Sequence, residues 1–211
     1  MKIEIWSDIM CPFCYIGKRR LEEALATFPQ KDEVEIEWKS FQLDPTITAQ
    51  PGKNVYEYLA ERKGMSVEQS MQMHQQVIES AKSVGLDYHF EKAVIANSFD
   101  AHRLIQLAKT KGLGDAAEER IFSAYFTEGE DAGNRETLLK LGQEIGLDGE
   151  EIRKTLENGT FSSEVYADIE EAQQLGVRGV PFFVFDRRYA VSGAQPTEVF
   201  TQTLEKAFEE N

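Results

Sequence analysis

Alternating apolar and polar residues near the amino terminus predict two β-strands. In residues 2–6, Ile3 and Ile5 share one side of the chain, and in residues 33–41 three apolar side chains alternate with charged ones. Between these segments, apolar residues recur at helical spacing over residues 12–28, so we expect a helix with one buried face. The first part of the chain therefore predicts the order strand, helix, strand.

The middle of the chain is expected to be all-helical, because strand patterns nearly vanish between residues 55 and 176. Ser66 and Gln69 have the spacing of a capping box, which predicts a helix running to about Val84. Further helical patterns, separated by glycine-containing breaks, cover residues 97–111, 115–125, 135–145, 150–158 and 163–175.

Strand character returns near the carboxyl terminus. Residues 181–185 form a continuous apolar run, which suits a strand buried on both faces, and residues 189–192 follow as a short strand. A last helix is expected to place Phe200, Leu204 and Phe208 inward.

The order of these elements predicts an α/β fold with a large all-helical insertion between its second and third strands. We expect residues 1–48 and 176–211 to form the domain that contains the sheet. Residues 49–175 are expected to form a separate helical insertion subdomain.

The charge of the chain limits its partners. The 37 acidic residues outnumber the 23 basic ones, which gives a net charge of −14. Nucleic acid and anionic membranes are therefore not expected to bind, and solubility is preferred to an acidic docking surface as the reason for the charge. No apolar run approaches the roughly 20 residues of a membrane span, and the amino terminus lacks a secretory pattern, so we expect a cytoplasmic protein.

Cys11 and Cys14 are the chain's two cysteines, in the stretch "DIMCPFCYIG". A permanent structural disulfide is not expected in a reducing compartment, so a close pair indicates catalysis or metal binding. Tetrahedral zinc needs four ligands, and His74, His89 and His102 do not complete a zinc-finger spacing with the pair, so no metal site is expected. Two unrelated core cysteines remain the alternative.

The position of the pair, after a strand and at the start of a helix, assigns different roles to the two thiols. Helix N-termini stabilise anions, and such sites lower a cysteine pKa from about 8.5 to roughly 3.5–7.5. We expect Cys11 at the helix tip to be open to a substrate disulfide and to act as nucleophile. Cys14, one turn deeper and buried, is expected to be the resolving thiol. Pro12 suits the first helical turn, and Phe13 is expected at the rim of the site.

Pro181 starts the expected third strand, although proline cannot donate to a sheet ladder. In thioredoxin-like folds this position holds a cis proline whose loop packs against the cysteine pair. Val180 would then offer its backbone N–H and C=O to an extended substrate chain. An ordinary trans proline entering a strand is the alternative.

Four blocks of the chain resemble the DsbA-like thioredoxin superfamily, and in particular its FrnE-type branch of thiol-disulfide oxidoreductases. They read "SDIMCPFCYIGKRRLE", "FQLDP", "NSFDAHRLIQLA" and "GVRGVPFFVFDRRYAVSGAQP", and they span nearly the whole chain in the expected order. The same branch is similar to 2-hydroxychromene-2-carboxylate isomerases and kappa-class glutathione transferases, which use glutathione.

The resemblance implies a thioredoxin-like fold, an active pair at Cys11 and Cys14, and a cis proline at Pro181. It also implies that the helix beginning near Asn97 faces the active-site cleft. Asn97 and His102 are therefore candidate substrate-binding residues, with Arg103 beside them as a partner for a carboxylate or glutathione. A helix cap remains open for Asn97, and a solvated helix face, or a core position for the histidine, remains open for the other two.

Phe13 is a departure from the periplasmic DsbA pattern, which has a histidine between the cysteines that helps stabilise the thiolate. The resemblance with Phe13 therefore predicts a less oxidising protein. The related isomerases generally have serine where this chain has Cys11, so Cys11 favours redox chemistry. Trp6 is expected at the rim of the site, and Asp8 is expected to cap a turn, with a proton relay as the alternative.

These features predict a thiol-disulfide oxidoreductase that reduces or isomerises disulfides in proteins or small molecules. A glutathione-dependent isomerase or transferase is the first alternative, and a non-catalytic redox sensor or chaperone module is the second. No tightly bound cofactor is expected, and glutathione is kept open as reductant or co-substrate. The substrate, the electron donor, the direction of the reaction and the oligomeric state are left open.

Overall fold

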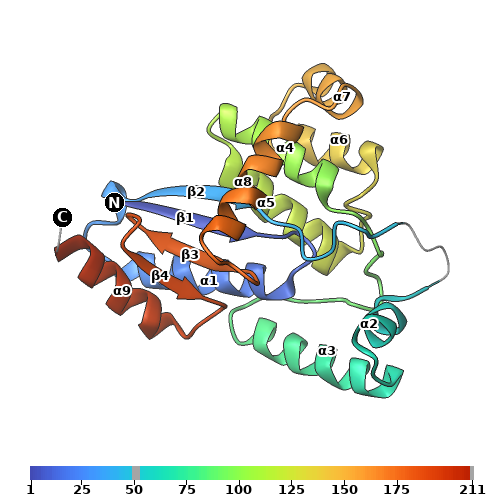
Figure 1. The fold of residues 1–211 in the computed structure, drawn as a ribbon, viewed down its shortest axis with the longest axis horizontal. Coiled ribbons are helices and arrows are strands. Elements are labelled where there is room, and N and C mark those ends of the chain that lie inside the picture. Colours follow the sequence, from blue (N-terminus) through green and yellow to red (C-terminus); the bar gives the residue numbers. More distant parts are fainter. Residues whose placement is uncertain (49–52, 210–211) are drawn as a thin grey trace. The chain divides into compact units, whose positions relative to one another are not determined.

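A computed structural model describes residues 1–48 and 53–209, which divide into two compact units (Figure 1). The first unit combines Met1–Leu43 with the chain from Phe161 onward, and the second is Asp44–Thr160. Both boundaries lie earlier than the sequence predicts. The larger difference is at the carboxyl side, where helix α8 (Ser162–Gln174) belongs to the sheet-containing unit and not to the insertion.

The first unit is built on a four-stranded sheet with the order β2-β1-β3-β4. The central strand β1 (Lys2–Ser7) pairs in parallel with β2 (Glu35–Ser40) and antiparallel with β3 (Phe182–Phe185). A short hairpin then adds β4 (Tyr189–Ser192) at the edge. All four strands were predicted, and the sheet confirms the expected α/β fold.

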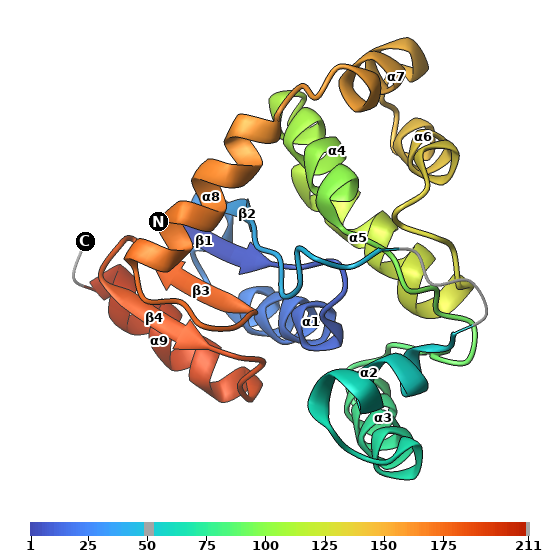
Figure 2. The same cartoon turned by 45° about the vertical axis from the view of Figure 1, so that its right-hand side comes forward.

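The sheet is covered on both faces, as Figures 1 and 2 show. Helices α1 (Pro12–Thr27) and α9 (Thr197–Glu209) lie on one face, and α8 lies on the other. The α1 face holds the larger core, since its side chains come from both helices and all four strands: Ile3, Ile5, Leu21, Ala24, Trp38, Phe183, Phe185, Val191, Phe200, Leu204 and Ala207. Each large aliphatic side chain buried in this way contributes about 1.5–3 kcal/mol to stability.

Helix α8 joins this unit because it hydrogen-bonds to two strands. The Trp6 indole donates to the Asp168 carbonyl at 2.9 Å, and the Asp168 carboxylate accepts from the Ser40 N–H at 3.0 Å. Helical periodicity predicts that a segment has an apolar face, but it does not identify the body on which that face packs.

In its described part, the second unit contains helices and turns and no strand. Its elements are α2 (Val55–Lys63), α3 (Val67–Lys82), α4 (Phe99–Thr110), α5 (Gly114–Ser123), η2 (Ala124–Glu128), α6 (Arg135–Glu144) and α7 (Gly149–Glu157). The capping box at Ser66 is confirmed, with Gln69 reaching back to the Ser66 N–H. Helix α2 was not predicted, although Asn54 and Glu57 form a second capping box at its start. Within the described residues, no helix combines the length and apolar character that a membrane crossing requires.

Candidate active site

A tight turn connects β1 to α1 and holds the first cysteine in place. The Cys11 N–H donates to the Asp8 carbonyl at 2.9 Å. The Asp8 carboxylate accepts from the Met10 N–H at 3.3 Å and from the Leu43 N–H at 2.7 Å. Asp8 therefore has the predicted turn role, and it also ties the turn to the chain that leaves β2.

Cys11 is the N-cap residue of α1, with extended backbone angles (φ −93°, ψ 109°) and no side-chain capping bond. Pro12 occupies the first turn, and that turn carries no acidic side chain. The positive end of the helix dipole is therefore not neutralised from within the helix, and an anionic sulfur at Cys11 would be stabilised there. This is the local arrangement that the spacing of the cysteines predicted.

The exposure of Cys11 differs from the prediction. Both cysteines are free thiols, and Cys11 is only 4% exposed. Its Sγ donates to the Val180 carbonyl at 3.3 Å, across a separation of 169 residues in the sequence. The expectation of an open sulfur was wrong for this state, because the loop that contains Val180 hydrogen-bonds to it.

Cys14 lies one turn deeper and is 1% exposed, as predicted. Burial raises the pKa of its thiol well above the ordinary value, and the neighbouring Cys11 raises it further. The Asp8 N–H and the Ser7 hydroxyl act in the opposite direction and lower this pKa, but burial dominates. The two thiols therefore occupy different environments, with Cys11 at the helix end and Cys14 in the interior.

The Val180–Pro181 peptide bond is cis, as predicted. A close contact with α1 holds this loop: a Cβ atom on Gly17 would lie 3.0 Å from both Pro181 Cγ and Phe183 Cζ. Sequence reasoning missed Gly17, although a glycine inside a helix is a signal for close packing because it costs about 1 kcal/mol relative to alanine. The missing side chain lets the helix lie directly on the proline loop.

Of the two aromatic residues expected at the rim of the site, one is exposed there and the other is buried elsewhere. Phe13 is 44% exposed beside the cysteines, in agreement with the prediction. Trp6 is fully buried, and its indole bonds to Asp168 of α8. Successive side chains of a strand point to opposite faces, so Trp6 lies on the face away from α1 and is not a rim residue.

Asn97, His102 and Arg103 belong to the second unit, and the structure uses them as internal contacts. Asn97 Nδ2 donates to the Pro45 and Ile47 carbonyls at 3.2 and 3.0 Å, and its Oδ1 accepts from the Phe99 N–H at 2.9 Å. His102 is fully buried, so a direct contact with substrate would require its surroundings to open.

The Arg103 guanidinium is committed to the carbonyl groups around the end of α7. Its Nε donates to Thr160 at 2.9 Å and its Nη atoms donate to the carbonyls of Thr155 and Leu156, while Asp100 pairs with it at 2.6 Å. Arg103 is 2% exposed, so the structure shows neither of the two roles left open for it, a charge offered to a ligand or a solvated helix face.

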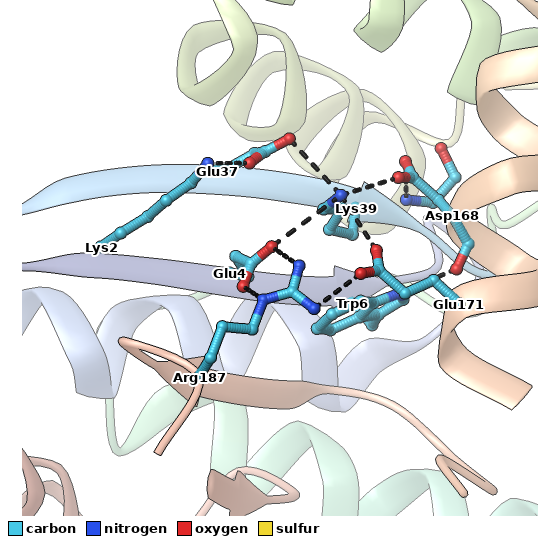
Figure 3. Close-up of polar contacts among 9 residues, drawn as sticks. Lys2, Glu4, Trp6, Glu37, Lys39, Asp168, Glu171 and Arg187 are labelled. Atoms are coloured by element: carbon cyan, nitrogen blue, oxygen red, sulfur yellow. Dashed lines mark hydrogen bonds and ion pairs between the residues drawn. The ribbon is translucent and has the colours of Figure 1, made fainter. Parts of the chain in front are cut away.

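A charged cluster that the sequence analysis missed lies on the α8 side of the sheet (Figure 3). Lys39 is central, with Nζ at 3.2 Å from Asp168, 3.1 Å from Glu171, 3.6 Å from Glu37 and 3.9 Å from Glu4. Burial lowers the pKa of Lys39, but these carboxylates outweigh it and the pKa is raised. Alternation carries no signal for this cluster, because Glu4 stands at a polar position between Ile3 and Ile5, and only the structure shows that it is buried.

Arg187, from the turn between β3 and β4, completes this cluster. It pairs with Glu4 and bonds to Glu171 at 2.6 Å. The cluster therefore joins β1, β2, α8 and the β3–β4 turn. Among the described residues, no group of three or more His, Cys, Asp or Glu side chains is arranged to hold a metal ion.

Comparisons with known proteins identify the family and the fold of the chain. The family model described as "DSBA-like thioredoxin domain" matches residues 2–205. The structure of a probable DsbA oxidoreductase from Streptomyces coelicolor is similar, with a TM-score of 0.92 and 43% identity, over 100% of this chain and 91% of that one. The uncharacterized protein YwbO of Bacillus subtilis is 28% identical, over 96% of this chain and 94% of its own.

More distant structures share the fold. The cytosolic disulfide reductase DsbM from Pseudomonas aeruginosa has a TM-score of 0.71 at 18% identity, with both chains covered completely. A structure of 2-hydroxychromene-2-carboxylate isomerase has a TM-score of 0.73 at 14% identity, over 100% of this chain and 98% of that one.

Proposed function

Because the chain belongs to the DSBA-like thioredoxin domain family, we propose that it is a FrnE-type thiol-disulfide oxidoreductase that reduces or isomerises substrate disulfides with Cys11 and Cys14. One observation carries the proposal. The two thiols are one helical turn apart, and one is at a helix N-terminus beside the cis-proline loop while the other is buried with a raised pKa.

The proposed reaction begins at Cys11. Its thiolate attacks one sulfur of a substrate disulfide, so that a Cys11–substrate disulfide forms and the other substrate sulfur leaves as a thiolate. Cys14 then attacks the Cys11 sulfur, which closes the Cys11–Cys14 disulfide and releases the second substrate thiol. The substrate gains two electrons and the pair loses them, and a thiol reductant must return the pair to its starting state.

The Val180 carbonyl has two roles in this scheme. In the resting state it accepts a hydrogen bond from the Cys11 thiol. Ionisation of Cys11 removes that donor and frees the carbonyl. We propose that an extended substrate chain then donates a backbone N–H to Val180, as a strand added beside the Pro181 loop. This exchange accounts for a nucleophile that is covered before the substrate arrives.

Glutathione is proposed as the thiol that returns the disulfide to two thiols, and a reducing compartment such as the cytoplasm as the location. The test is to treat the oxidised protein with glutathione and to label the thiols that form. Labelling of both cysteines at physiological glutathione concentrations supports the proposal. A pair that stays oxidised would require another reductant.

The function is tested by turnover with single-cysteine variants. Reduction of insulin disulfides should be lost in both Cys11→Ser and Cys14→Ser, and only Cys14→Ser should accumulate a mixed disulfide. A glutathione-dependent isomerase or transferase would need no resolving thiol, so full activity of Cys14→Ser on such substrates would favour that alternative.

A further inference from the structure

The last residue of β1 places a polar group at a core position. Ile3, Ile5 and Ser7 alternate along the strand and share one face, and the first two pack in the core that contains Leu21 and Ala24 of α1. Ser7 is fully buried, and among the described residues its hydroxyl has no hydrogen-bond partner of good geometry. Buried hydroxyl groups are normally satisfied, so this one requires an explanation.

Strand alternation directs Ser7 toward α1, on the side of that helix where Cys14 lies. Cys14 lies two turns before Leu21 and therefore on the same side of α1, toward β1. The Ser7 hydroxyl and the Asp8 N–H both act on this sulfur and lower its pKa against the effect of burial. They are the two donors that the end of the strand directs at the resolving thiol.

The protonation state of Cys14 decides how much the hydroxyl gains. A neutral thiol is a weak acceptor, so the Ser7 hydroxyl is poorly satisfied while Cys14 keeps its proton. A thiolate is a charged acceptor, and hydrogen bonds to charged acceptors are roughly twice as strong as neutral ones. The hydroxyl therefore gains a full partner when Cys14 ionises, which is the state that resolution requires.

We propose that Ser7 donates a hydrogen bond to the Cys14 thiolate and so accelerates resolution of the mixed disulfide on Cys11. This inference rests on the proposed function. In the step, the Cys14 sulfur forms a bond to Cys11 Sγ while the bond from Cys11 to the substrate sulfur breaks. The proton that Cys14 loses balances the proton gained by the departing substrate thiolate. Ser7 stays protonated and supplies only the hydrogen bond.

The first experiment titrates Cys14 without requiring any turnover. In a Cys11→Ser background, the ultraviolet absorbance of the thiolate reports Cys14 alone. Ser7→Ala should raise its pKa by about one unit, so that the thiolate fraction at neutral pH falls about tenfold. Ser7→Thr, which keeps the hydroxyl, should stay near the parent. Equal titration of Ser7→Ala and its parent would overturn the proposal.

The second experiment measures the resolving step in the protein with both cysteines. After rapid mixing with a disulfide peptide, the mixed disulfide should persist about threefold longer in Ser7→Ala, because the higher nucleophilicity of a more basic thiolate partly offsets the smaller thiolate fraction. Iodoacetamide should label Cys11 at an unchanged rate, which separates this effect from general damage to the site. An unchanged lifetime would overturn the role in resolution.

The two experiments also separate this inference from the proposed function. If Cys14 titrates as expected but neither protein forms a mixed disulfide, the oxidoreductase assignment fails while the Ser7–Cys14 hydrogen bond stands. If mixed disulfides form and resolve equally fast in both proteins, the assignment stands and the role of Ser7 in resolution fails.

Discussion

At the scale of single residues, the chemistry depends on two sulfurs in different environments. Cys11 lies at the end of a helix and bonds to a carbonyl, whereas Cys14 is buried with a pKa well above the ordinary value. Such a pair supports an attack from one thiol and a delayed attack from the other. The difference arises from where α1 begins.

The raised pKa of Cys14 predicts a pH dependence of stability in the reduced protein. An unfolded cysteine ionises near pH 8.5, while Cys14 in the folded state keeps its proton to higher pH. Below about pH 8.5, Cys14 is protonated in both the folded and the unfolded state, so its ionisation does not reduce the free energy of unfolding. Above that pH, the free energy of unfolding should fall by about 1.4 kcal/mol per pH unit relative to Cys14→Ala. Urea unfolding at several pH values measures this, and parallel curves for the two proteins would contradict it.

A second prediction at the scale of single residues concerns Phe13 and the redox potential of the cysteine pair. Phe13 brings no charge to the pair, so a redox titration against glutathione should give a potential nearer to about −270 mV, as in thioredoxin, than to about −120 mV, as in DsbA. Phe13→His should raise the potential by about 30 mV for each tenfold gain in the stability of the thiolate form. Because Phe13 is exposed, this variant should fold normally. A wild-type potential close to that of DsbA would contradict the prediction.

At the scale of elements, α1 must lie close to the proline loop for the Cys11–Val180 bond to form. Gly17 permits this approach, because a Cβ there would lie 3.0 Å from Pro181 Cγ. Gly17→Ala should therefore lower stability by about 1–3 kcal/mol through overpacking, although alanine is the better helix former. It should also slow the reaction of the pair with disulfides.

The matched control for this prediction is Gly179→Ala in the same loop. A Cβ at Gly179 meets no atom within 4 Å, and its backbone does not require glycine. This variant should leave stability and reactivity near the wild-type values. If the two alanine variants behave alike, close packing at Gly17 is not what positions the loop.

The charged cluster predicts that the packing of α8 on the sheet depends on Lys39. Lys39→Met would leave the nearby carboxylates without their central cation, and removing one partner of a buried pair costs about 3–5 kcal/mol. The loss should shrink at acid pH as the carboxylates become protonated. Lys2→Met is the control: the Lys2 side chain is 45% exposed and pairs with Glu37 at the edge of the cluster, so its loss should stay within about 1 kcal/mol. Equal urea midpoints for the two variants would exclude this role of Lys39.

At the scale of the whole molecule, local patterns predicted most of the architecture. Alternation identified the first two strands and a continuous apolar run the third, with the fourth predicted to follow it, and helical periodicity placed Cys14 in the interior. The errors concern long-range packing. The cover over Cys11 comes from a loop 169 residues away, and α8 was placed in the wrong unit because its partners Trp6 and Ser40 lie far away in the sequence. Helix α2 was missed because it is short and buries few apolar residues.

The most direct test of the account is to identify which cysteine carries the substrate. Cys14→Ala is mixed with a disulfide peptide, quenched with acid and mapped by peptide mass spectrometry. The account predicts a mixed disulfide on Cys11 that thiol reductants release. In Cys11→Ala, the buried Cys14 should form none on the same time scale. A substrate adduct on Cys14 in Cys11→Ala at the same rate, or none on Cys11 in Cys14→Ala, would contradict the assigned roles.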